Sequence, residues 1–145
     1  MGPGVQRTFA ALGGLGAGVL LALQFVPFEG ERTNPPVVAE PDWPDPAARE
    51  VFETSCAACH SNRTDWPWYS NVAPMSWLVV QDVMEGRDEF NASRWDEDDG
   101  EADDAVEEVL EGSMPPLSYV LAHPSARLTG AERDVLVDAL RAMDD

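Results

Sequence analysis

Hydrophobic and polar residues divide the chain into three stretches with different patterns. Residues 8–28 form a run of 21 residues without an ionisable side chain, and as a helix this run would be about 31 Å long, close to the hydrocarbon thickness of a bilayer. Residues 29–44 are polar and contain four prolines, which predicts a semi-extended tether. In residues 45–145 apolar positions recur at helical spacing between turns. The pattern predicts an all-α domain joined to an N-terminal membrane anchor, residues 1–28.

Capping residues indicate where the helices of the domain begin and end. Asp45 is a good N-cap and Pro46 suits the first helical position, whereas Gly112 suits a helix end. Thr129 and Glu132 form a capping box for the last helix, which we expect to pack against the helix carrying the cysteines. The acidic residues 96–100 predict a solvated loop. Apart from the last one, the expected helices cover residues 47–60, 74–90, 102–111 and 117–122.

The N-terminal run suits either a cleaved signal peptide or an uncleaved anchor. It is longer than a usual signal-peptide core, and no convincing A-x-A site precedes residues 24–28, which favours the anchor. Arg7 precedes the run and the first acid, Glu29, follows it. The positive-inside rule therefore predicts a single pass through the cytoplasmic membrane, with the N-terminus inside and the domain on the periplasmic side.

Charge is distributed very unevenly along the chain. The net charge is −18, there are 27 acids, and all nine basic residues are arginines. Every acid lies at or after residue 29. Such a surface repels nucleic acid and anionic lipid and favours a basic partner, although selection for solubility alone explains it equally well.

The densest chemistry in the chain is the run Cys56-Ala57-Ala58-Cys59-His60, which holds both cysteines and one of the two histidines. Two thiols at this spacing can add to the two vinyl groups of one haem, while the adjacent imidazole binds the iron. A redox dithiol needs no histidine there and would be expected in a β-α-β pattern. A zinc site would have to recruit the distant His123. We therefore expect one covalently attached haem c, held by Cys56 and Cys59, with His60 as an iron ligand.

Met114 is the best candidate for a second iron ligand. It lies 54 residues after His60 and is followed by two prolines, which would hold the thioether in a rigid turn. The alternatives for this ligand position are His123, Met75, Met84 and an open coordination position.

An aromatic loop follows the cysteine motif. Trp66, Trp68 and Tyr69, together with Arg63, have the side chains needed to wall a haem and to bond its propionates. Ordinary core packing under the loop is the other interpretation, and the sequence does not choose between them.

With these residues in view, the chain resembles the small haem-binding domain family of bacterial membrane-anchored c-type cytochromes. The resemblance covers nearly the whole chain and departs from the family pattern at residues 96–104, which look like an enlarged acidic loop. It implies a cytochrome-c-like fold around one haem. The shared motifs are Q-F-x-P at residues 24–27, T-N-P-P at 33–36, C-x-x-C-H-S-N at 56–62, W-P-W-Y-S-N at 66–71, A-P-x-S-W-L at 73–78, E-G-x-M-P at 111–115 and Y-x-x-x-H-P-x-A-x-L-T at 119–129.

Together these features predict an electron carrier rather than an enzyme. With His60 and Met114 both bound to iron, no position is left for a substrate. The expected partners are redox donor and acceptor proteins, in some cases within a larger membrane complex, and not nucleic acid. The alternatives are a haem sensor or haem enzyme with an open or labile sixth position, and a structural haem subunit of a respiratory or photosynthetic complex.

Overall fold

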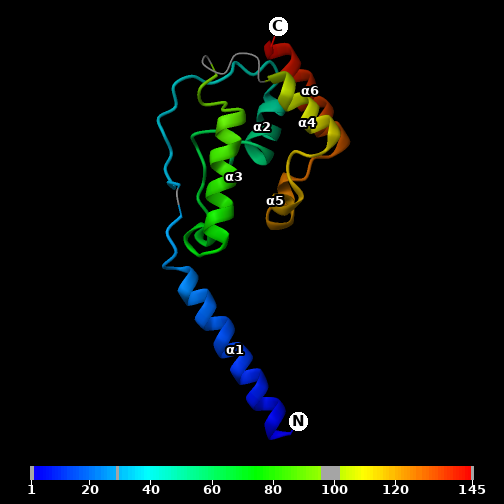
Figure 1. Ribbon diagram of the computed structural model, residues 1–145. Coiled ribbons are helices and arrows are strands. Elements are labelled where there is room, and N and C mark those ends of the chain that lie inside the picture. Colours follow the sequence, from blue (N-terminus) through cyan, green and yellow to red (C-terminus); the bar gives the residue numbers. More distant parts are fainter. Residues whose placement is uncertain (1, 29, 96–101, 145) are drawn as a thin grey trace. The chain divides into compact units, whose positions relative to one another are not determined.

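The computed structural model describes residues 2–28, 30–95 and 102–144, and every regular element in these ranges is a helix, without a β-strand (Figure 1). This confirms the predicted all-α class. The residues 96–100, predicted to be a solvated loop, lie outside the described ranges. The α-helices are α1 Pro3–Leu23, α2 Pro46–Ser55, α3 Met75–Glu89, α4 Ala102–Glu111, α5 Leu117–Ala122 and α6 Gly130–Asp144, and the 3₁₀ segments are η1 Trp68–Asn71 and η2 Pro124–Ala126.

The chain divides into two compact units, and the division falls inside α3. One unit, here called the anchor unit, consists of Met1–Arg32 and Trp66–Gln81. The other, the acidic unit, consists of Thr33–Asp65 and Asp82–Asp145.

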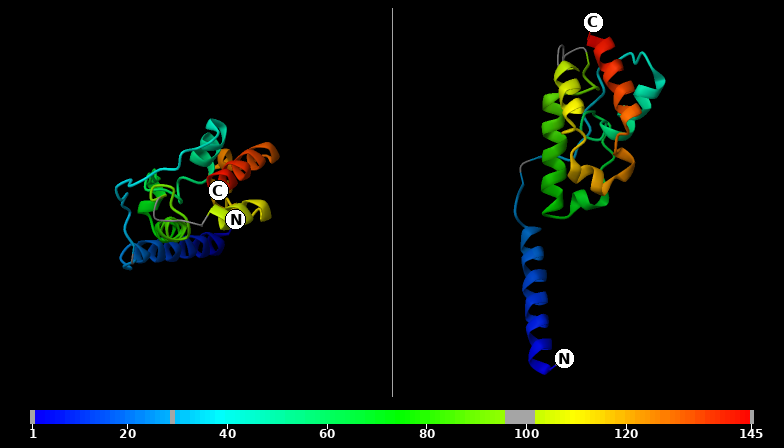
Figure 2. Two further views of the ribbon diagram at one scale, coloured as in Figure 1. Left: turned by 90° about the horizontal axis from the view of Figure 1, so that it is seen from above. Right: turned by 90° about the vertical axis from the view of Figure 1, so that its right-hand side faces the viewer.

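In the acidic unit, α6 is the central helix. Both α2 and α4 pack against it, and α2 also contacts η2; Figure 2 shows α4 and α6 side by side in two further views. This arrangement confirms that the last helix packs against the helix leading to the cysteines. Their shared core consists of Phe52, Phe90, Ala92, Val106, Val109, Leu136, Val137 and Leu140.

The predicted helix ends are confirmed by their hydrogen bonds. The carboxylate of Asp45 accepts from the Ala47 amide at 2.8 Å. Thr129 and Glu132 form the reciprocal capping box, with bonds of 2.8 and 3.3 Å, and these bonds lower the pKa of Glu132. Gly112 ends α4 with φ +78°, a conformation that a side chain rarely adopts.

The prediction that one helix continues to His60 is wrong, because α2 ends at Ser55. The amides of Cys56 and Ala57 both donate to the Phe52 carbonyl, and those of Cys59 and His60 both donate to the Cys56 carbonyl. The Ala57 bond spans five positions and the Cys59 bond three, so the regular i→i−4 ladder is interrupted here. The cysteines therefore lie on a compact turn after the helix, which we call the CxxCH turn, residues 56–60.

The proline-punctuated segment before α2 forms no helix in its described part, and from residue 33 onward it is not a free spacer. The amides of Val38 and Ala39 donate to the Ser93 carbonyl at 2.9 and 3.2 Å, and Ala39 forms an isolated bridge with Arg94. These residues therefore form part of the acidic unit.

In the anchor unit, the residues that directly follow α1 contact the segment 66–81. Its stretch Gly4–Leu23 is long and apolar enough to cross a membrane. The Gln24 side chain donates to the Ala73 carbonyl and accepts from the Ala73 amide, both at 3.0 Å. Phe28 stacks on Trp77 with ring centroids 6.3 Å apart.

Candidate haem site

Two cavities of about 360 and 410 Å³ lie beside the CxxCH turn and share the lining residues Cys56, His60, Glu89 and Met114. Cys59 lines the second cavity. Each volume is in the range typical of small-molecule sites. Four of the residues expected to hold a haem are therefore brought together from two segments that are far apart in the sequence.

The walls of these cavities suit a large apolar ligand. The first is lined by side chains of the hydrophobic core, and the second continues towards the turn that follows Met114. A porphyrin needs such a surface because most of its ring is apolar. The apolar wall residues are Phe52, Phe90, Val109, Leu136 and Leu140.

His60 is held in the tautomer that an iron ligand needs. Its Nδ1 lies 3.1 Å from the Phe90 carbonyl oxygen, and because a carbonyl only accepts, Nδ1 carries the proton and Nε2 keeps its lone pair. Burial lowers the pKa of His60, although the backbone contact with Phe90 opposes this shift. The ring is therefore neutral and oriented, with Nε2 as its metal-binding atom.

The surroundings of the two cysteines favour uncharged sulfur. Burial, followed by the charge of Cys59, raises the pKa of Cys56 to about 12. Burial and then Asp82 raise the pKa of Cys59 to about 11. Redox dithiols and zinc ligands work as thiolates, which low-pKa environments provide. These surroundings fit neutral thioether bonds to a haem better than either alternative.

Gly86 of α3 lets the helix approach the CxxCH turn closely. A Cβ atom at this position would lie 3.0 Å from the Cys59 Cβ and 3.1 Å from the Cys59 carbonyl oxygen. The sequence placed this residue inside the expected helix 74–90 and predicted no role of its own for it. The missed signal is the glycine itself, because glycine inside a helix costs about 1 kcal/mol relative to alanine and needs a packing reason.

A buried polar network supports the backbone that holds His60, and the sequence did not reveal it. Asn91 donates to the Asn62 side chain at 3.0 Å, and Asn62 donates to the Pro36 carbonyl at 2.9 Å. Ser93 accepts from the Asn62 amide at 2.9 Å. Phe90, whose carbonyl orients His60, directly precedes Asn91. The network therefore acts as a positioning device for the histidine.

Arg87 was also missed, although it makes four hydrogen bonds around the same turn. Its guanidinium donates to the Ser61 carbonyl at 2.9 Å and to the Thr64 hydroxyl at 2.8 Å. It also donates to the Thr33 carbonyl at 2.9 Å and the Asn34 side chain at 3.0 Å. Burial lowers the pKa of Arg87 from its ordinary value. The only sequence signal for this role was that Arg87 is one of few basic residues and directly follows a glycine within a helix.

Met114 reaches the cavity from the turn that ends α4. The Met114 amide donates to the Glu108 carbonyl at 3.2 Å, and the hydroxyl of Ser113 donates to the Glu108 carboxylate. About 36% of the Met114 surface is exposed. His123, the main alternative, instead stacks on Tyr119 with centroids 4.5 Å apart, and neither it nor Met84 is among the described residues lining the two cavities.

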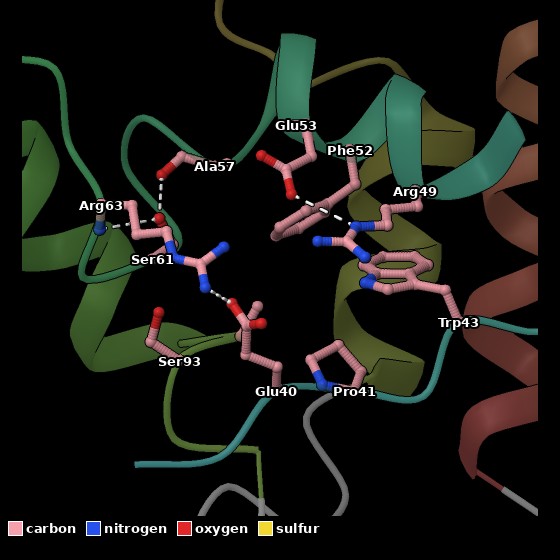
Figure 3. Close-up of a pocket in the computed structure, with 11 residues that line it drawn as sticks. Glu40, Pro41, Trp43, Arg49, Phe52, Glu53, Ala57, Ser61, Arg63 and Ser93 are labelled. Carbon is pink, nitrogen blue, oxygen red and sulfur yellow. Dashed lines mark hydrogen bonds and ion pairs between the residues drawn. The ribbon is translucent and has the colours of Figure 1, made fainter. Parts of the chain in front are cut away.

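Four predicted site residues lie elsewhere among the described residues. Arg63 pairs with Glu40 at a separate cavity of about 40 Å³ (Figure 3), which has room for about one water molecule. Trp66, Trp68 and Tyr69 belong to the anchor unit, where the rings of Trp68 and Tyr69 meet edge to face. A role for these four in binding haem stays a prediction.

All charged side chains that line the two cavities within the described residues, His60 aside, are acidic. They come from the second half of α3 and from α4, and burial followed by repulsion from Glu85 raises the pKa of Asp82. The site therefore lies in a negative electrostatic field. These residues, here called the acidic rim, are Asp82, Glu85, Glu89, Asp104, Glu107 and Glu108.

Comparison with known proteins agrees with this geometry. The haem-binding domain family matches residues 18–142, a range that includes the CxxCH turn, Met114 and the end of α1. No curated protein and no solved structure matches the chain. Because the match covers most of the sequence, the chain belongs to the haem-binding domain family.

Proposed function

We propose that the protein is a membrane-anchored c-type cytochrome with one covalent haem, which carries single electrons between redox partners outside the cytoplasmic membrane. The observation that supports this most strongly is the meeting of Cys56, Cys59, His60 and Met114 around one pair of cavities. The N-terminus would lie in the cytoplasm and the acidic unit on the periplasmic side, with α1 as the anchor.

Each residue has a distinct task in this proposal. A bound haem supplies an iron centre that takes up and releases one electron. Cys56 and Cys59 hold the group covalently, and His60 presents Nε2 because Phe90 occupies Nδ1. Met114 offers a neutral, soft thioether from the opposite segment. The acidic rim favours the more positive oxidised state and therefore lowers the reduction potential.

Replacing Met114 with alanine is expected to convert a low-spin iron into a high-spin one and to lower the midpoint potential, since the thioether is lost as a ligand. Optical and electron paramagnetic resonance spectra of the purified protein in both redox states measure this change. His123→Ala is the matched comparison, because His123 stacks on Tyr119 and does not line the cavities. It should leave the spectra unchanged.

The same pair of variants separates the electron carrier from the sensor or enzyme alternative, which the partial exposure of Met114 favours. A wild-type iron that is already high-spin, or that binds carbon monoxide as fast as Met114→Ala does, would support an open or labile sixth position. A spectral change in His123→Ala alone would make His123 the ligand.

The acidic rim is expected to select basic partners during electron exchange. Oxidation of the reduced protein by a cationic cobalt(III) complex should slow several-fold as salt is raised, whereas oxidation by anionic ferricyanide should accelerate. The double variant Asp104→Asn/Glu107→Gln should flatten both salt dependences. Asp134→Asn/Asp138→Asn on α6, which removes the same charge away from the cavities, is the control. Equal effects of the two variants would show that net charge, not the rim, steers the reaction.

A further inference from the structure

The division of the fold into two units separates the charges of the chain almost completely. The anchor unit contains two arginines and two glutamates, so its formal charge is zero, and the acidic unit carries the whole net charge of −18. Residues 66–81 contain no charged side chain, although a quarter of the chain is charged. This segment therefore differs in character from everything else that follows α1.

The uncharged segment is attached to the end of the apolar helix. Gln24 directly follows α1, and its amide group pairs with both backbone groups of Ala73, as a neighbouring β-strand would. Arg32 donates to the Ser70 carbonyl, and Phe28 stacks on Trp77. Within the anchor unit, these contacts hold the segment at the level of the last turn of α1.

Large apolar side chains make up most of the exposed surface of the segment, and its exposed polar side chains are Asn71 and Gln81. About 79% of the Trp68 surface and 53% of the Leu78 surface are exposed. In water, such a concentration of exposed large apolar groups is unfavourable, and it usually marks an interaction surface. The other exposed members are Val72 and Met75 in this segment and Phe25, Val26 and Phe28 next to it.

We propose that residues 66–81 form an interfacial collar, which lies in the headgroup layer of the bilayer beside the exit of α1. The proposal rests on the proposed membrane anchoring. The helix ends at Leu23, so the span is Gly4–Leu23 and not the longer run 8–28. Its 20 residues are about 30 Å long, and Arg7, in the second turn of α1, reaches back to the inner headgroups. This leaves Gln24, and Ala73 with it, at the outer headgroups. Tryptophan is enriched at this depth. A neutral segment also avoids the repulsion that the acidic unit meets at anionic lipid.

Photolabelling in lipid vesicles tests the collar. The full-length haem-loaded protein is inserted into vesicles of phosphatidylcholine and phosphatidylglycerol, and a lipid-soluble carbene reagent and a water-soluble radical reagent are applied in parallel. Peptide mapping should show carbene label in both 8–28 and 66–81. Label in 8–28 without label in 66–81 overturns the collar and leaves the anchor intact. Absence of carbene label from both ranges overturns the anchoring itself.

The water-soluble reagent identifies what covers the segment if lipid does not. Labelling of 66–81 by that reagent alone means that the segment faces solvent, and protection from both reagents means that protein covers it, so each result overturns the collar. The variant Trp68→Glu/Leu78→Glu should reduce carbene labelling of 66–81 at least threefold with 8–28 unchanged. Leu117→Glu/Leu121→Glu, which alters two exposed leucines of the acidic unit, should have no effect on the labelling of either range.

Discussion

The variant Gly86→Val is expected to be less stable than the wild type by about 3 kcal/mol and to carry much less covalent haem. The first added carbon already lies 3.0 Å from the Cys59 Cβ and 3.1 Å from the Cys59 carbonyl oxygen, and valine adds two methyl groups. Overpacking of this kind costs about 1–3 kcal/mol, sometimes more. Relief would require α3 or the CxxCH turn to move, which displaces Cys59, one of the two proposed attachment points of the haem. Gly86→Ala should show a smaller loss.

Urea unfolding monitored by circular dichroism, together with the haem-to-protein ratio, measures this effect. The control is Gly130→Val in the first turn of α6, where an added Cβ meets no atom within 4 Å. A Gly86→Ala protein that is more stable than the wild type would mean that helix propensity outweighs the close approach. The contact with Cys59 would then carry no importance for stability.

Replacing Arg87 with methionine is expected to destabilise the haem-loaded protein by about 3 kcal/mol. Hydrogen bonds from a charged group contribute about 1.5–3 kcal/mol each, and bonds that share one guanidinium do not add independently. Methionine preserves much of the stem but leaves four acceptors, among them the Ser61 carbonyl, without this donor. The loss falls on the segment that directly follows the CxxCH turn.

Arg87→Lys separates charge from geometry in the same unfolding measurement. Lysine keeps the positive charge but lacks the planar fork, so less than half of the lost stability should return. Arg141→Met removes an exposed arginine from the last turn of α6 and should change stability by less than about 0.5 kcal/mol. Full stability in Arg87→Lys, or equal losses in the two methionine variants, would contradict the assigned role of the guanidinium.

The features that local sequence predicts correctly are those that local hydrogen bonds determine. The caps at Asp45 and Thr129 and the end of α4 at Gly112 depend on residues within three or four positions, and all of them are confirmed. The CxxCH run was recognisable because its chemistry is contiguous. Met114 could be singled out because of its spacing and its two prolines, and it does line both cavities; its role as an iron ligand stays a prediction.

The features that the sequence did not reveal depend on contacts between distant segments. The Phe90 carbonyl that orients His60 lies 30 positions away from it, and Arg87 bonds to Thr33, 54 positions away. Neither pairing leaves a periodic trace in the sequence. The early end of α2 differs, because the bonds around it are local: the hydroxyls of Ser61 and Thr64 donate to the carbonyls of Ala57 and Ala58, four and six positions earlier. The sequence also did not show that Trp66 and Trp68 belong to the anchor unit and not to the unit that contains the cysteines.

The proposed haem site has two segments that carry an iron ligand, and the rest of the fold supports them very unequally. This difference determines which segment would open first. The histidine side is held by buried side-chain hydrogen bonds and by the close contact at Gly86. The methionine side depends on the exposed bonds of Ser113 and on α4, which among the described helices packs only against α6. Local unfolding begins at the element that the fewest contacts hold in place. Thermal fluctuations would therefore release the thioether while the imidazole stays in place, so that ligand exchange at the iron would take place on one side only.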